Sequence, residues 1–83
     1  MSANPTGVPF DRQQALQLKN LGDNIRRERV RQSLSQERLA EMVNLHPRTI
    51  QKIEAGKVNT LFTTIMRFQR ALRCSWECLL GKP

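Results

Sequence analysis

The 83-residue sequence has no tyrosine, one tryptophan, one histidine and only two cysteines. Cys74 and Cys78 are too few and too close together for a disulfide framework or a zinc site. The lone His46 has no second base, nucleophile or carboxylate cluster beside it in sequence. We therefore expect no enzyme, no metal and no cofactor, and the scarcity of cysteine indicates a reducing, cytoplasmic compartment.

Long hydrophobic stretches are also missing. The longest apolar run is far shorter than the roughly 20 residues that a membrane-spanning helix needs. The N-terminal stretch MSANPTGVPF lacks the basic region and apolar core of a secretory signal. We interpret residues 1–10 as a flexible tail and residues 11–83 as one domain.

Acidic residues are outnumbered two to one. Fourteen Lys and Arg against seven Asp and Glu give a net charge of +7. Such an excess in a small domain indicates a polyanionic partner, nucleic acid before membrane. Charge alone is weak support, because many small soluble domains are basic.

Strand patterns are absent, whereas helical spacing recurs, so the sequence predicts an all-α fold of five helices. The first helix is expected to begin after Asp11, with Gln14 completing a capping box, and to end near residues 32–33. Gly22 lies inside it and is expected to mark a break. Later apolar stripes indicate a fourth helix with Ile65, Phe68 and Leu72, extended by Leu61 or Phe62, and a fifth with Trp76, Leu79 and Leu80.

The central segment 35–56 has the spacing of two short helices joined by a tight turn, which is a helix-turn-helix arrangement. Ser35 is a good N-cap for the first of them, and Asn44 tolerates the left-handed backbone that ends it. In the second, His46 occupies the N-cap and Pro47 the first helical position, where proline favours a helix start.

The outward face of that second helix is basic. Ile50 and Ile53 define its buried side, so at about 100° per residue Arg48 and Ala55 point outward. Gln51 and Lys52 lie on either side of them. Arginine, lysine and glutamine are the side chains that read base edges in a major groove. The alternative interpretation is an ordinary solvated face on a surface helix.

The motifs LSQERLA, TIQKIEAGK and ALRCSWECLL, at this spacing, resemble the Cro/phage-repressor (Xre) family of helix-turn-helix DNA-binding domains over residues 21–80. The resemblance implies a compact lambda-repressor-like fold and a nucleoid-associated transcriptional regulator, with no small-molecule ligand. It also implies residue roles: Gln36 holding a phosphate, Arg48, Gln51 and Lys52 reading bases, Lys57 and Asn59 contacting the DNA backbone, and Arg29 with Glu54 forming a structural salt bridge.

The sequence departs from the family pattern at several positions. Asn44 stands where glycine is usual, and His46 stands where a small hydroxyl residue is usual. Pro47 replaces a polar residue often used for base contact, so direct readout is not carried over there. Arg73 replaces a glycine at the end of the fourth helix and requires either a left-handed backbone or a different helix end.

The resemblance implies a sequence-specific regulator or repressor that binds a near-palindromic operator as a homodimer. Phe62, Met66 and Trp76 are candidates for the dimer surface. The alternative is a protein-interaction module of the same fold, an antitoxin or bridging factor, in which DNA binding is secondary. Cys74 matches a core position, whereas Cys78 is a candidate for a more exposed thiol.

Overall fold

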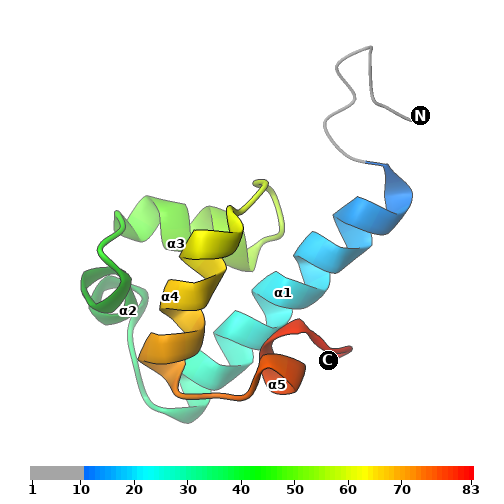
Figure 1. Cartoon of the computed structure of the whole chain (residues 1–83). Helices are drawn as coiled ribbons and strands as arrows, with labels where there is room; N and C mark the ends of the chain where they lie inside the picture. Colours follow the sequence, from blue (N-terminus) through cyan, green and yellow to red (C-terminus); the bar gives the residue numbers. More distant parts are fainter. Residues whose placement is uncertain (1–10) are drawn as a thin grey trace.

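The computed structural model describes residues 11–83, and the expected tail at residues 1–10 lies outside the described residues. Within residues 11–83 the chain forms five α-helices and no strand, which confirms the all-α prediction (Figure 1). No helix in this part of the chain is both long and apolar enough to cross a bilayer. The helices are α1 (Arg12–Arg31), α2 (Gln36–Val43), α3 (Pro47–Glu54), α4 (Phe62–Leu72) and α5 (Trp76–Leu80).

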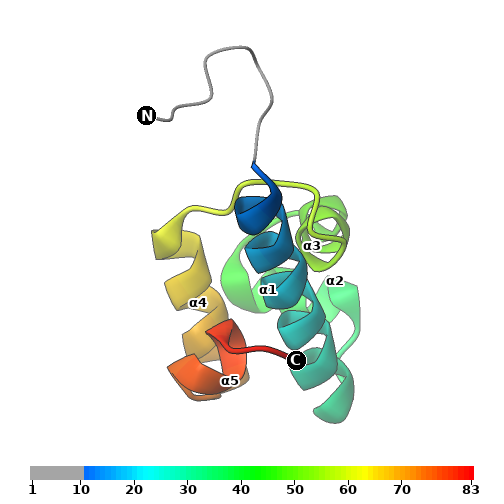
Figure 2. The same cartoon turned by 90° about the vertical axis from the view of Figure 1, so that its right-hand side faces the viewer.

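The long helix α1 organises the domain. It packs against α3, α4 and α5, and α2 packs against α3 and α4 (Figures 1 and 2). The core lies among these helices, where burial of apolar side chains supplies the main stabilisation. Its buried members are Leu21, Ile25, Leu39, Ala40, Val43, Ile50, Ile53, Phe68, Leu72, Cys74 and Leu79.

Helix α1 begins where the sequence predicts, but the break expected at Gly22 is absent. Asp11 Oδ1 accepts from the Gln14 N–H at 2.8 Å, and the capping box is complete. The helix then runs through Gly22 without interruption. A Cβ on Gly22 would lie 2.4 Å from the carbonyl oxygen of Ile53, so glycine is required here by the close approach of two backbones.

The predicted stripe of α4 needs one correction. Phe68 and Leu72 are buried and Ile65 packs against the core, but Leu61 and Phe62 are 71% and 61% exposed. Leu61 is the extended N-cap residue, and Phe62 lies about 120° around the helix from Phe68. At the other end, Arg73 adopts the left-handed conformation with φ of 53° and ends the helix without glycine.

Candidate nucleic-acid interface

The turn between α2 and α3 has the geometry that its residues favour. The Ser35 side chain accepts from the Arg38 N–H and caps α2. Asn44 ends the helix in the left-handed region (φ 58°, ψ 51°), and the Leu45 N–H donates to the Ala40 carbonyl at 2.9 Å. An asparagine therefore replaces the usual glycine without opening the turn, because its short polar side chain tolerates this conformation.

The first turn of α3 is capped by its histidine. Nδ1 of His46 accepts from the Arg48 N–H at 3.0 Å, and Pro47 follows at the first helical position. Because Nδ1 is the acceptor, a neutral His46 carries its proton on Nε2. The proline thus starts the helix, and the histidine satisfies one of the N–H groups that every helix start leaves open.

The outer face of α3 is free of carboxylates. Ile50 is fully buried and Ile53 nearly so, which turns the opposite face to solvent. Arg48, Gln51 and Lys52 are exposed there, and within residues 11–83 their side chains form no hydrogen bond or ion pair with the rest of the chain. Their donors and acceptors are therefore available to an external partner.

Behind this face, Glu54 ties three helices together. Arg29 donates two hydrogen bonds to Glu54, from Nε to Oε2 at 2.7 Å and from Nη2 to Oε1 at 3.1 Å. Nε2 of Gln36, the first residue of α2, donates to the same Oε1 at 3.0 Å. The side chains of Arg29 and Glu54 are only 11% and 4% exposed, so this is a largely buried, bidentate charge pair. It fixes the orientation of α3 relative to α1 and α2.

The segment after α3 carries two further predicted residues. Gly56 has φ of 71°, and the Lys57 N–H donates to the Lys52 carbonyl at 3.0 Å. Lys57 and Asn59 are both exposed on the loop that leads into α4. The structure therefore brings them to the C-terminal end of α3, next to Lys52.

The start of α4 is a feature that the sequence reasoning missed. Among the described helices, α1, α2, α3 and α5 each have a side-chain N-cap bond, whereas Leu61 provides none for α4. Nearby, Thr60 Oγ1 is buried and has no hydrogen-bond partner within residues 11–83. The signal was present in the sequence, because leucine stands where Ser, Thr, Asp or Asn would cap a helix.

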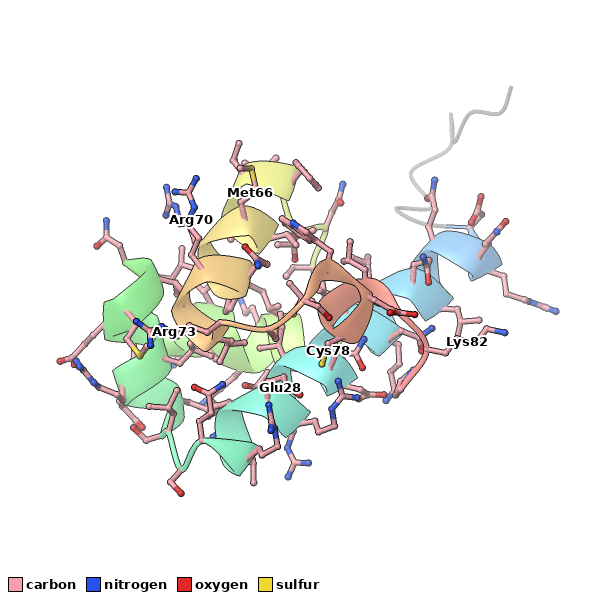
Figure 3. The ribbon with its side chains drawn as sticks, turned by 60° about the horizontal axis from the view of Figure 1, so that its bottom comes forward. Glu28, Met66, Arg70, Arg73, Cys78 and Lys82 are labelled. Atoms are coloured by element: carbon pink, nitrogen blue, oxygen red, sulfur yellow. The ribbon has the colours of Figure 1, made fainter. Side chains whose placement is uncertain are left out.

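A second buried carboxylate, Glu28, lies on α1 where that helix meets α5. Arg31 Nη2 donates to its Oε1 at 2.6 Å, and the Cys78 thiol lies 3.2 Å from its Oε2 (Figure 3). The Arg31 bond holds the pKa of Glu28 below its ordinary value, against the opposing effect of burial. Burial raises the pKa of the Cys74 thiol, which keeps it protonated.

Two aromatic side chains form an exposed surface on α4 and α5. The rings of Phe62 and Trp76 stack with centroids 5.7 Å apart and planes 13° from parallel. Leu61 and Leu80 are also exposed, and Met66 is half-buried. Within residues 11–83, no three His, Cys, Asp or Glu side chains gather in a metal-binding arrangement.

Comparison with known proteins identifies the family of the chain and two similar structures. A helix-turn-helix family model matches residues 25–77. The crystal structure of the restriction-modification controller protein C.AhdI from Aeromonas hydrophila matches with a TM-score of 0.70 and 29% identity, over 75% of this chain and 94% of the controller. The hypothetical transcription factor NHTF from Neisseria matches with a TM-score of 0.77 and 26% identity, over 98% of this chain and 90% of NHTF. A search of curated proteins found no match.

Proposed function

Because this chain belongs to the Xre/lambda-repressor-like helix-turn-helix family of DNA-binding transcriptional regulators, we propose that it acts by inserting α3 into the major groove of a specific operator. Residues 11–83 form the DNA-binding domain in this proposal. No catalytic step is required, since occupancy of the site is itself the regulatory event. The two structural neighbours, a restriction-modification controller protein and a hypothetical transcription factor, support this role.

The outward face of α3 is the observation that carries the proposal. Arg48 reads guanine through O6 and N7, and Gln51 and Lys52 contact neighbouring bases, because these donors match the groove edges. The Arg29–Glu54–Gln36 network supports this role by holding the helix in one orientation. Pro47 has no donor and contributes apolar contact only.

Phosphate contacts flank the reading face. Lys57 and Asn59 bind the DNA backbone from the loop after α3, and Gln36 binds it from the first turn of α2. The uncapped start of α4 adds open N–H groups and a positive dipole end, which suit a phosphate oxygen. These contacts set register and affinity, whereas the α3 side chains set sequence preference.

A homodimer completes the proposal. The stacked Phe62 and Trp76, with Met66 beside them, form the apolar surface through which two copies associate. An isologous dimer places its two α3 helices in successive major grooves about 34 Å apart. The operator is then near-palindromic.

Selection from a random duplex library tests these points together. We expect an enriched near-palindrome with half-sites about one helical turn apart. Enrichment of an asymmetric site would contradict the dimer, and the absence of any enriched sequence would contradict specific readout.

The first variant prediction concerns Arg48. Arg48→Ala is expected to lose about 1–3 kcal/mol on the selected operator and to relax preference at one base position. Lys82→Ala is the matched control, because Lys82 is exposed and follows Gly81, whose carbonyl accepts from Asn24 where α1 meets α5. An equal loss on every sequence tested would make Arg48 a phosphate contact instead.

The alternative is a protein-interaction module in which DNA binding is secondary. The carboxylate-free face of α3 disfavours it, and the exposed Phe62–Trp76 surface is the feature that favours it. Salt dependence separates the two, since each phosphate contact contributes about 0.9 to the slope of log affinity against log salt. A flat response would support the interaction module.

A further inference from the structure

One edge of α1 carries three exposed cations at seven-residue intervals, Arg12, Lys19 and Arg26. Seven residues turn an α-helix about 20° short of two full turns, so the three side chains form a line about 21 Å long. Two acidic residues lie near it: Asp23 pairs with Lys19 at 3.0 Å in an exposed ion pair, and Asp11 precedes Arg12 as the N-cap of the helix. We call these three cations the α1 stripe.

The α1 stripe lies beside the proposed DNA-binding elements. The backbone of Gly22 touches the last turn of α3, where a Cβ would lie 2.6 Å from the Glu54 carbonyl oxygen. The backbone of Lys19 touches Gly56 at the start of the following loop, where a Cβ on Gly56 would lie 2.9 Å from the Lys19 Cα. Around the helix, Lys19 and Arg26 lie within about 60° of Gly22. At Lys19 and Arg26 the stripe therefore follows the edge of α1 that adjoins α3 and the Lys57 loop, and Arg12 continues it about two turns toward the N-terminus of the helix.

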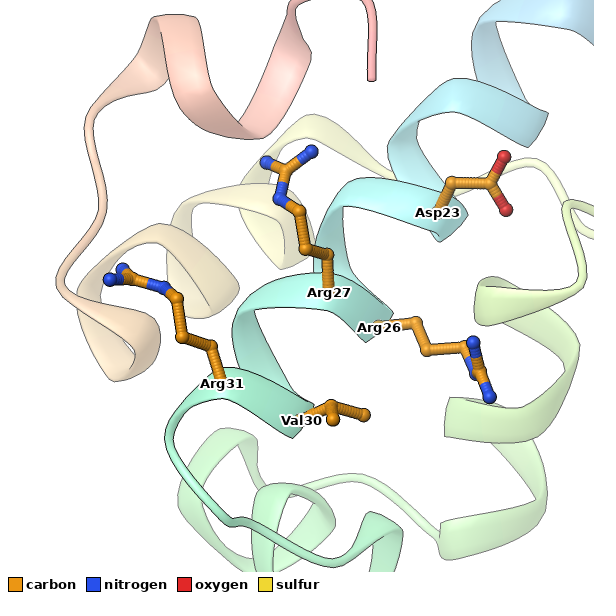
Figure 4. Close-up of a pocket in the computed structure, with 5 residues that line it drawn as sticks. All are labelled: Asp23, Arg26, Arg27, Val30 and Arg31. Atoms are coloured by element: carbon orange, nitrogen blue, oxygen red, sulfur yellow. The ribbon is translucent and has the colours of Figure 1, made fainter.

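Two other arginines on α1, Arg27 and Arg31, have hydrogen-bond partners in the chain, whereas Arg26 has none within residues 11–83. Arg27 donates to Asn24 Oδ1 and to the Cys78 carbonyl, and Arg31 donates to Glu28. Figure 4 shows Arg26 pointing away from both of them, on the other side of α1. Within residues 11–83 its guanidinium has no hydrogen-bond or ion-pair partner.

We propose that the α1 stripe binds the phosphate backbone of the same duplex and so extends the interface beyond the α3 face. This rests on the proposed DNA-binding function. Three cations in a row, almost free of acids, complement a polyanion that carries one charge per about 1.7 Å of axis. The exposed Lys19–Asp23 ion pair is weak, so Lys19 can exchange Asp23 for a phosphate at little cost. Arg12 and Lys19 lie outside residues 25–77, so the family match does not account for them.

The test compares salt dependence on the operator selected from the random library. In the triple variant Arg12→Gln/Lys19→Gln/Arg26→Gln, glutamine keeps helix propensity while removing each charge. We expect the log–log salt slope to fall by about 2.7, or about 0.9 for each phosphate that is no longer neutralised. Sequence preference stays unchanged, because phosphate contacts carry no base information. In ethylation interference, a matching set of phosphates should disappear from the footprint.

Matched controls separate the α1 stripe from a general charge effect. Arg70→Gln/Arg73→Gln/Lys82→Gln removes three exposed charges elsewhere on the domain (Figure 3), and its ethylation footprint should match that of the wild-type chain. An unchanged salt slope and footprint in the triple variant would contradict phosphate binding by the α1 stripe. An acidic protein surface would then be the partner of these cations. Absence of specific binding by the wild-type chain itself would instead overturn the proposed function. Circular dichroism verifies that α1 remains folded in each variant.

Discussion

Helix α1 meets α3 and α5 in two different ways. Toward α3 the contact is tight and charged, with Gly22 against backbone and the buried Arg29–Glu54 pair. Toward α5 the contact is polar and partly open, since Arg27 and Arg31 are 42% and 68% exposed at their side chains. Helix α3 is thus fixed by a buried charge pair and a backbone contact, whereas on the α5 side two of the charged side chains reach solvent beside the fully buried Leu79.

Two asparagine bonds are the exception on the α5 side. Asn24 is fully buried, and its Nδ2 donates to the Leu79 carbonyl at 2.8 Å and to the Gly81 carbonyl at 2.7 Å. These bonds satisfy carbonyls at the end of a helix only five residues long, which could not be stable by itself. Asn24 therefore fixes the position of α5 against α1, as Glu54 fixes that of α3. It does so with a neutral side chain in place of a charge.

The largest effect should come from breaking the α3 contact. Glu54→Ala leaves the Arg29 guanidinium buried without its partner, and we expect a loss of about 3–5 kcal/mol in unfolding free energy. Urea denaturation measures the loss. Operator affinity should fall further in conditions where the domain remains folded, because α3 is no longer held by α1 and α2.

Glu41→Ala is the control for this prediction, since Glu41 pairs with Arg38 in an exposed ion pair. Its expected loss is at most about 1 kcal/mol. If Glu54→Ala proved no more costly than Glu41→Ala, the α3 contact would have no advantage over a surface pair, and the contrast between the two sides of α1 would fail.

The second effect concerns Asn24. Asn24→Ala leaves the Leu79 and Gly81 carbonyls without their donor, and we expect a loss of about 1–3 kcal/mol in unfolding free energy. Hydrogen exchange should show faster opening of α5 with little change in α3, because the Arg29–Glu54 pair is untouched. Asn20→Ala, one turn earlier on α1, is the control. Equal loss of protection in α3 and α5 would mean that the two contacts are not separable.

The sequence predicts most of this architecture because local signals dominate it. The caps at Asp11, Ser35 and His46 involve residues two or three positions apart, which a sequence pattern can reveal. The place of Gly22 could not be predicted in this way, because its reason is the Ile53 carbonyl 31 positions later in the chain. The same limit applies to Phe62, whose exposure depends on where α4 begins and what covers it.

The roles proposed for the interface also differ in whether a local sequence pattern or a contact in space determines them. The outward direction of Arg48 and Lys52 follows from the period of one helix, so the sequence suffices to place them on one face. The α1 stripe and the burial of Thr60 before α4 depend on what lies beside them in space, whereas the leucine at the cap position of α4 was visible in the sequence. The burial of Glu28 was missed for the same reason, since the Cys78 thiol beside it is 50 positions away in sequence, although its closest partner Arg31 is only three.

The smallest effect should come from the pH dependence of Glu28. A carboxyl with a lowered folded-state pKa adds stability above its unfolded value, here about 4.5, and loses it as pH falls through the folded value. Glu28→Gln should cost about 1 kcal/mol at pH 7, because its arginine partners Arg27 and Arg31 are 42% and 68% exposed. The difference in unfolding free energy between wild type and Glu28→Gln should then shrink below about pH 4.5. Glu54 is common to both proteins and cancels, so a difference that stayed constant down to acid pH would show that Glu28 stabilises the fold through hydrogen bonds and not through its charge.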